Sequence, residues 1–96
     1  PTALLAFNDM TAIGALSAAY DLGLSVPEDL SLIGYDNTFV ARIRHISLTS
    51  VDNGSFAVGA QAGRFLLERL TAPTLPQRIH QVPAELQVRG STSTPR

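Results

Sequence analysis

The chain has 96 residues, of which 45% are hydrophobic and 16% are charged, and its formal net charge is -1. This composition is typical of one folded domain and excludes a disordered chain. The seven basic residues are all arginines and are scattered, whereas DNA-binding domains usually gather basic residues on one surface. We therefore expect no direct nucleic-acid binding by this segment. The absence of cysteine excludes disulfides, cysteine-bound zinc and a thiol nucleophile.

No apolar run approaches the ~20 residues that a membrane-spanning helix needs. We also expect no secretory leader, because the N-terminus has no basic n-region. The chain opens on Pro1 and Thr2 and continues directly into an apolar stretch. We therefore expect it to be a piece of a longer protein.

The first third of the chain predicts a strand, a helix and a second strand. Residues 3–7 form a continuous apolar run whose length suits a strand buried on both faces. Helical spacing of apolar residues follows, with Asn8 or Asp9 as N-cap and Gly23 as the stop. Residues 30–35 read as the second buried strand. This order predicts a right-handed parallel βαβ unit.

The remaining elements are shorter. The strongest turn signal is Asp52-Asn53-Gly54-Ser55, and the pattern becomes helical from Ser55 to about Leu70. Further short strands are expected at 48–51, 78–82 and 85–89. We also expect a short helix or turn at 38–43, a loop at 72–76 and a loose tail at 90–96.

Both strands of the predicted βαβ unit run into polar residues, Asn8-Asp9 after the first and Asp36-Asn37 after the second. The carboxyl ends of parallel strands meet at one edge, where ligands of open α/β sheets bind. Phe7 and Tyr35 precede these pairs and should point the other way, so we expect them in the core. The sequence therefore predicts a site for a small polar ligand at this edge.

Four blocks at 8–16, 23–36, 48–51 and 83–92 carry the patterns Asn-Asp-Met-x-Ala-Ile-Gly-Ala-Leu, Gly-Leu-x-Val-Pro-Glu-Asp-Leu-Ser-Leu-Ile-Gly-Tyr-Asp, Leu-Thr-Ser-Val and Pro-x-Glu-Leu-x-Val-Arg-x-Ser-Thr. In order and spacing they resemble the lactose/galactose repressor (LacI/GalR) family over essentially the whole chain. The resemblance implies an α/β fold with a parallel three-layer sheet, of the periplasmic-binding-protein-like (type I) kind. It also implies that this chain is the C-terminal part of an effector-binding domain, without the DNA-binding headpiece.

Two subdomains joined by crossovers are implied by the same resemblance. Residues 1–51 and 86–96 would belong to the C-terminal subdomain, and residues 55–82 would cross to the N-terminal subdomain. The hinge would lie at Asp52, Asn53 and Gly54 on the way out and at Pro83 on the way back.

Asp36, Asn8 and Asn53 fall where the family contacts its effector. A carboxylate such as Asp36 suits the hydroxyls of a sugar or, as a second choice, an amine of a purine. Each has a structural alternative: Asp36 as a cap of the helix after it, Asn8 as the N-cap, and Asn53 as a turn residue. Asn37 and Asp52 stand where the family often has an acid and a basic residue, which leaves the effector open.

The resemblance further implies a homodimer formed by the helix at 11–20 and the apolar residues Ile43, Ile46 and Leu48, although a core role would also explain these three. We expect a cytoplasmic regulator that binds operator DNA through its headpiece, with a small-molecule effector and no membrane association.

Two other functions are alternatives to this one. A periplasmic sugar-binding protein of a transport system would share the fold. A glycosidase would use Asp9 and Asp36 as its acid and base, but nothing sets their pKa values apart, so we expect no enzyme and no catalytic residue. His45 and His80 lack acidic neighbours at metal spacing, and we expect no metal and no cofactor.

Overall fold

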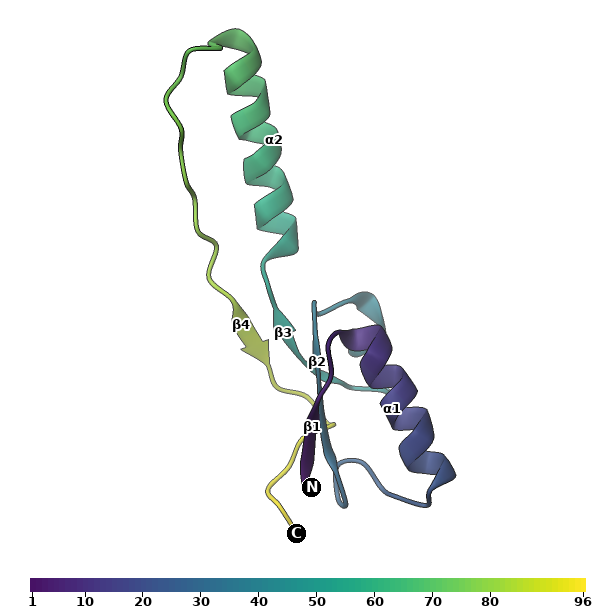
Figure 1. The fold of residues 1–96 in the computed structure, drawn as a ribbon. Helices are drawn as coiled ribbons and strands as arrows, with labels where there is room; N and C mark the ends of the chain where they lie inside the picture. Colours follow the sequence, from purple (N-terminus) through teal and green to yellow (C-terminus); the bar gives the residue numbers. More distant parts are fainter.

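The computed structural model describes residues 1–96 and contains a four-stranded sheet, two α-helices and a 3-10 helix (Figure 1). In chain order the elements are β1 Ala3–Leu5, α1 Asp9–Asp21, β2 Ser31–Tyr35, η1 Phe39–Arg42, β3 Thr49–Asp52, α2 Ser55–Thr71 and β4 Glu85–Gln87. Figure 1 shows α1 beside the sheet and α2 projecting beyond its end. No helix is long and apolar enough to cross a membrane.

The strands lie in the order β1-β2-β3-β4. β1, β2 and β3 are parallel, with Leu4 opposite Leu32 and Gly34 opposite Ser50. This confirms the parallel βαβ unit. β4 is antiparallel to β3, with Leu86 opposite Val51, a direction that the sequence pattern did not specify. An antiparallel strand at the edge of a parallel sheet is common in α/β proteins.

Helix α1 begins and ends at the residues that the sequence marks. Asn8 is extended, with φ at -155°, and its side-chain oxygen accepts a 2.8 Å hydrogen bond from the Thr11 N–H. Asn8 is therefore the N-cap, and Asp9 occupies the first turn, where a negative charge is favoured. After the helix, Gly23 has φ at +72°, a conformation that glycine adopts without strain.

The core is a small cluster between α1, β2, η1 and the segment before β3. Its fully buried members are Ala12, Leu32, Ala41 and Leu48, and Ile46 packs against it. Leu48 is 1% exposed, so the core role that we gave as the alternative explains this residue, and the dimer interface stays a prediction. Ile43 is 42% exposed and remains available to a partner.

Several apolar side chains that we expected to be buried are exposed in this chain. Phe7 is 85% exposed and Tyr35 is 38% exposed, so their expected burial in the core is wrong. β1 is exposed along its whole length because it is the edge strand and has a neighbour on one side only. Apolar surface of this extent is characteristic of a face that another part of a protein covers.

The molecule is elongated, with a radius of gyration of 18.0 Å against about 12 Å for a compact domain of this length. Helix α2 has no buried residue, and the segment 72–84 returns alongside it (Figure 1). We call α2 and the returning segment 72–84 the arm. It contains residues 55–82, the range expected to cross to a second subdomain. The division into subdomains stays a prediction. The strand predicted at 78–82 is absent, since no neighbouring strand pairs with it.

The C-terminal segment is not the loose tail that its composition predicts. Ser91 is buried, and its backbone exchanges hydrogen bonds with Leu32 N–H and Ser47 O, at 2.9 and 3.0 Å. Its hydroxyl accepts from Thr49 N–H at 2.8 Å and donates to Leu32 O at 2.5 Å. Ser91 therefore joins the β2 strand to the start of β3, a role that Ser, Thr and Pro content does not reveal.

Candidate functional site

Three consecutive parallel strands each lead into an Asn/Asp pair at the same edge of the sheet. Asn8-Asp9 follows β1, Asp36-Asn37 follows β2, and Asp52-Asn53 closes β3. The sequence predicted the first two pairs as one edge, and it placed the third in a turn. We call these six residues the polar edge.

Within the polar edge, Asp36 and Asn53 contact each other. The Asn53 Nδ2 group donates a 2.9 Å hydrogen bond to Asp36 Oδ1, and Asn53 Oδ1 accepts one of 3.0 Å from the Ser55 N–H. The structural alternative for Asp36 was a cap of the helix after it, and this is wrong, because η1 has no side-chain cap. The structural alternative for Asn53, a turn residue, agrees with its bond at the start of α2.

A second row of hydrogen bonds links Asn37 to the end of β3. Asn37 Nδ2 donates to Asp52 Oδ2 at 3.0 Å, and Asp52 Oδ1 accepts from the Gly54 N–H at 2.8 Å. Arg89 donates to Asn37 Oδ1 at 2.5 Å and to the Leu48 carbonyl at 2.7 Å. Sequence reasoning missed Arg89, because nothing in its neighbourhood along the chain indicates a contact with residues 40 or more positions away.

The same contacts keep Asp52 ionised. The backbone N–H of Gly54 and the side-chain amide of Asn37 hold the pKa of Asp52 below its ordinary value. The charges of Arg42 and Arg89 act in the same direction, and partial desolvation opposes them. Asp52 is therefore harder to protonate in the folded chain than an ordinary aspartate.

Asp9 is 0% exposed and lies behind the loop that carries Asp36. Its Oδ2 accepts from the Thr38 N–H at 2.7 Å and from the Thr38 hydroxyl at 2.8 Å, and its Oδ1 accepts from the Ser50 hydroxyl at 2.6 Å. Asp9 is thus a structural residue, whose carboxylate ties the start of α1 to Thr38 and to β3. Asn8 caps α1 with its oxygen, and its contact with an effector stays a prediction.

A cavity of about 350 Å³ opens beside the polar edge. Its lining combines two carboxylates, an amide, a guanidinium and an exposed aromatic ring, from the residues Asp36, Asn37, Arg42, Asp52, Gly54, Ser55, Phe56 and Ala57. Phe56 is 92% exposed. Sequence reasoning missed Phe56 as a residue of the site. No group of three or more His, Asp or Glu side chains is placed to hold a metal ion.

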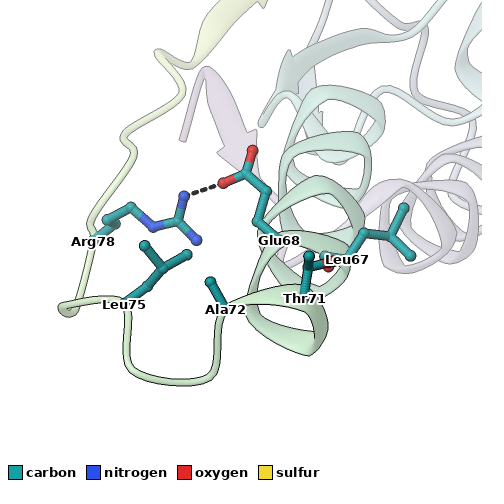
Figure 2. Close-up of a pocket in the computed structure, with 6 residues that line it drawn as sticks. All are labelled: Leu67, Glu68, Thr71, Ala72, Leu75 and Arg78. Atoms are coloured by element: carbon teal, nitrogen blue, oxygen red, sulfur yellow. Dashed lines mark hydrogen bonds and ion pairs between the residues drawn. The ribbon is translucent and has the colours of Figure 1, made fainter.

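A larger cavity of about 490 Å³ lies on the arm, away from the polar edge (Figure 2). Its walls are mainly apolar, and the ion pair between Glu68 and Arg78 spans it. Arg78 also stacks over the Phe65 ring at 4.2 Å from its centroid. Its charged groups already have partners, so we place the candidate site at the smaller, more polar cavity.

Comparison with known proteins agrees with this arrangement. A family model described as "Periplasmic binding protein-like domain" matches residues 1–92. The solved structure of a LacI-family transcriptional regulatory protein from Corynebacterium glutamicum is 48% identical, with a TM-score of 0.85; the match covers 98% of this chain and 35% of that one. The chain belongs to the LacI/GalR family.

Other members of the LacI/GalR family match nearly the whole chain. A LacI-family regulator from Enterococcus faecium, solved with bound ribose, is 30% identical with a TM-score of 0.93; the match covers 99% of this chain and 35% of that one. The transcriptional repressor PurR of Pasteurella multocida is 37% identical over 98% of this chain and 28% of its own length. The chain therefore spans about a third or less of the LacI/GalR proteins that it matches.

Proposed function

We propose that this chain is the effector-binding part of a ligand-responsive transcriptional repressor, and that the effector is a small hydroxylated molecule, a sugar or a sugar derivative. The observation that carries the proposal is the polar edge, where β2 and β3 deliver the carboxylates of Asp36 and Asp52 and the amide of Asn37 to one cavity of about 350 Å³. Two related regulators have been solved with sugars: the one from Enterococcus faecium with bound ribose, and the transcriptional regulator CelR in complex with cellobiose.

The chemistry of Asp36 supports a hydroxylated effector. Its Oδ1 accepts from Asn53, and its Oδ2 has no hydrogen-bond partner within the chain. A carboxylate oxygen binds a ligand hydroxyl more strongly than a neutral acceptor does. The Asn53 amide beside it can both donate and accept. A purine, which would offer an amine to Asp36, is the second class of effector.

Effector binding would act on the arm through the hinge. Asn53 bonds to Asp36 and to the Ser55 N–H at the start of α2. Asp52 bonds to Asn37 and to the Gly54 N–H just before α2. A ligand that binds one arrangement of these groups better than the other shifts the equilibrium toward it. We assign the hinge to Asp52, Asn53, Gly54 and Pro83. The exposed apolar face of the arm is the surface that the rest of a full-length relative would cover.

A homodimer belongs to the same proposal. Met10 and Tyr20 on α1 and Ile43 after η1 are exposed apolar side chains, and Leu48 is left out because it is in the core. In this proposal, the pair of chains presents two DNA-binding headpieces to an operator.

The two other functions are less well supported. The relatives named above are regulators, which favours the regulator over a transport protein. For a glycosidase, Asp9 would need access to substrate, but it is fully buried and both of its oxygens accept hydrogen bonds from the chain.

The proposal is tested with the full-length protein that carries this chain. An operator is first selected from a pool of random-sequence duplexes, and its affinity is then measured by fluorescence anisotropy with and without ribose, cellobiose and hypoxanthine. A sugar that changes the operator affinity at least about tenfold supports the proposal, since allosteric coupling is typically 5- to 150-fold. A protein that selects no duplex, or that hydrolyses a glycoside, contradicts it.

A further inference from the structure

We propose that Asp9 is a positioning residue of the candidate site: its buried carboxylate holds the loop at Asp36 to Thr38 in the conformation that presents Asp36 and Asn37 to the cavity. The expected effect of Asp9 on effector affinity rests on the proposed function. Its structural part stands on contacts of this chain alone.

The loop has a backbone conformation that it would rarely adopt unaided. Asp36 has φ at +103° and Asn37 has φ at +49°, so two consecutive residues that are not glycine lie in the left-handed half of φ. Such conformations persist where the surroundings hold them, and they gather at functional sites.

Asp9 fixes both backbone N–H groups that follow Asp36. The Thr38 N–H donates directly to Asp9 Oδ2 at 2.7 Å. The Asn37 N–H donates at 3.0 Å to the Ser50 hydroxyl, which itself donates to Asp9 Oδ1 at 2.6 Å. The Thr38 hydroxyl adds a third donor to the carboxylate. Bonds to an ionised acceptor in a buried site are stronger than neutral ones, so this carboxylate is well suited to hold the loop.

The fold reserves the space for this carboxylate. The Asn8 cap fixes Asp9 in the first turn of α1, directly over β2. At the facing position of β2 stands Gly34, where a Cβ atom would collide with Asp9 Oδ1. Gly34 therefore has a steric purpose in a strand where glycine is otherwise unfavourable. Neither Asp9 nor Gly34 lines the cavity, so both act through the loop.

The structural part is tested on the full-length protein by hydrogen exchange and mass spectrometry of peptides spanning 34–40, without ligand. Asp9→Ala is compared with Leu30→Ala, a substitution of a buried residue at the opposite end of β2, under conditions of matched loss in Tm. We expect faster exchange in this peptide for Asp9→Ala, by at least about tenfold, and no such change for Leu30→Ala. Equal exchange in the two variants would overturn the proposal.

The functional part is tested by calorimetry with D-ribose in a double-mutant cycle. We expect Asp9→Ala to weaken ribose binding about tenfold or more. Asp9→Asn should keep the affinity within about threefold of wild type, because its side-chain oxygen can still accept from Thr38. In the Asp36→Asn background, Asp9→Ala should cause no further loss of affinity. A loss of equal size in both backgrounds would show a general structural role and overturn the proposal.

The two tests separate this inference from the proposed function. Wild-type protein that binds neither ribose nor cellobiose, or an Asp36→Asn variant that binds the sugar unchanged, would count against the proposed effector site. In that case, the exchange measurement still decides whether Asp9 holds the loop.

Discussion

The carboxylate of Asp36 accepts a 2.9 Å hydrogen bond from the side-chain amide of Asn53, which lies where the chain leaves the sheet for α2. The same amide group of Asn53 accepts from the Ser55 N–H at the start of α2. A ligand that competes for Asp36 therefore acts on a residue that also bonds to the first residue of α2. This arrangement gives the polar edge a direct connection to the segment expected to move.

Replacing Asn53 tests this connection. Asn53→Ala removes the bond to Ser55 N–H and leaves Asp36 Oδ1 without its donor, so we expect a loss of about 1 kcal/mol in the free energy of unfolding. Chemical denaturation of the full-length protein measures it. Gln61→Ala is the control, since Gln61 bonds only to Arg64 on the exposed surface of α2. Equal losses for the two variants would show that Asn53 has no special role.

The pH dependence of stability tests Asp52. Because its pKa is lower in the folded protein than ordinarily, Asp52 contributes stability above its ordinary pKa, and this contribution is lost as the pH falls through the lower, folded value. Wild type should therefore exceed Asp52→Asn in Tm at pH 7, and the gap should narrow below about pH 4. Thermal melts of both proteins from pH 7 to pH 3 provide the comparison, and a gap that stays constant contradicts the assignment.

The buried hydroxyl of Ser91 provides a third test. Ser91→Ala leaves the Thr49 N–H and the Leu32 carbonyl without a side-chain partner, at a cost of about 1–3 kcal/mol in the free energy of unfolding. Ser93→Ala, two residues on and exposed, should cost less than about 0.5 kcal/mol. Urea unfolding measures the free energy of unfolding of both variants. A Ser91→Ala protein as stable as Ser93→Ala would contradict the role of the buried hydroxyl.

The close approach of Gly34 to Asp9 predicts a fourth effect. Gly34→Ala places a methyl group against the Asp9 carboxylate and should destabilise the fold by about 1–3 kcal/mol while loosening the loop at 36–38. Ile33→Val, at the neighbouring strand position, should cost about 1 kcal/mol and leave the loop unchanged. Hydrogen exchange of this loop in the two variants separates the outcomes; unaltered exchange in Gly34→Ala would argue against a steric role.

The sequence predicts those parts of the molecule whose signals are local. The strand, helix and strand up to Tyr35, the Asn8 cap and the turn at Gly54 follow from residue types that act within a few positions. The first two pairs of the polar edge, Asn8-Asp9 and Asp36-Asn37, also follow, since the carboxyl ends of parallel strands meet at one edge. These elements therefore required no knowledge of the tertiary structure.

The parts that could not be predicted depend on distant partners. Ser91 and Arg89 make their contacts about 40 to 60 residues away, and neither contact leaves a periodic pattern. The strand predicted at 78–82 needs a neighbour that this chain does not supply. Likewise, Phe7 and Tyr35 are exposed because burial depends on what covers a surface, and an apolar pattern does not specify that.

The most direct test of the central claim is calorimetric titration of the full-length protein with ribose and cellobiose, comparing wild type, Asp36→Asn and Asp21→Asn. Asparagine tolerates the positive φ of Asp36 while removing the charge, and Asp21 is an exposed acid at the end of α1, away from the polar edge. We predict that wild type and Asp21→Asn bind one of these sugars equally well and that Asp36→Asn binds it at least about tenfold more weakly. Binding of the sugar by Asp36→Asn with wild-type affinity would contradict this prediction.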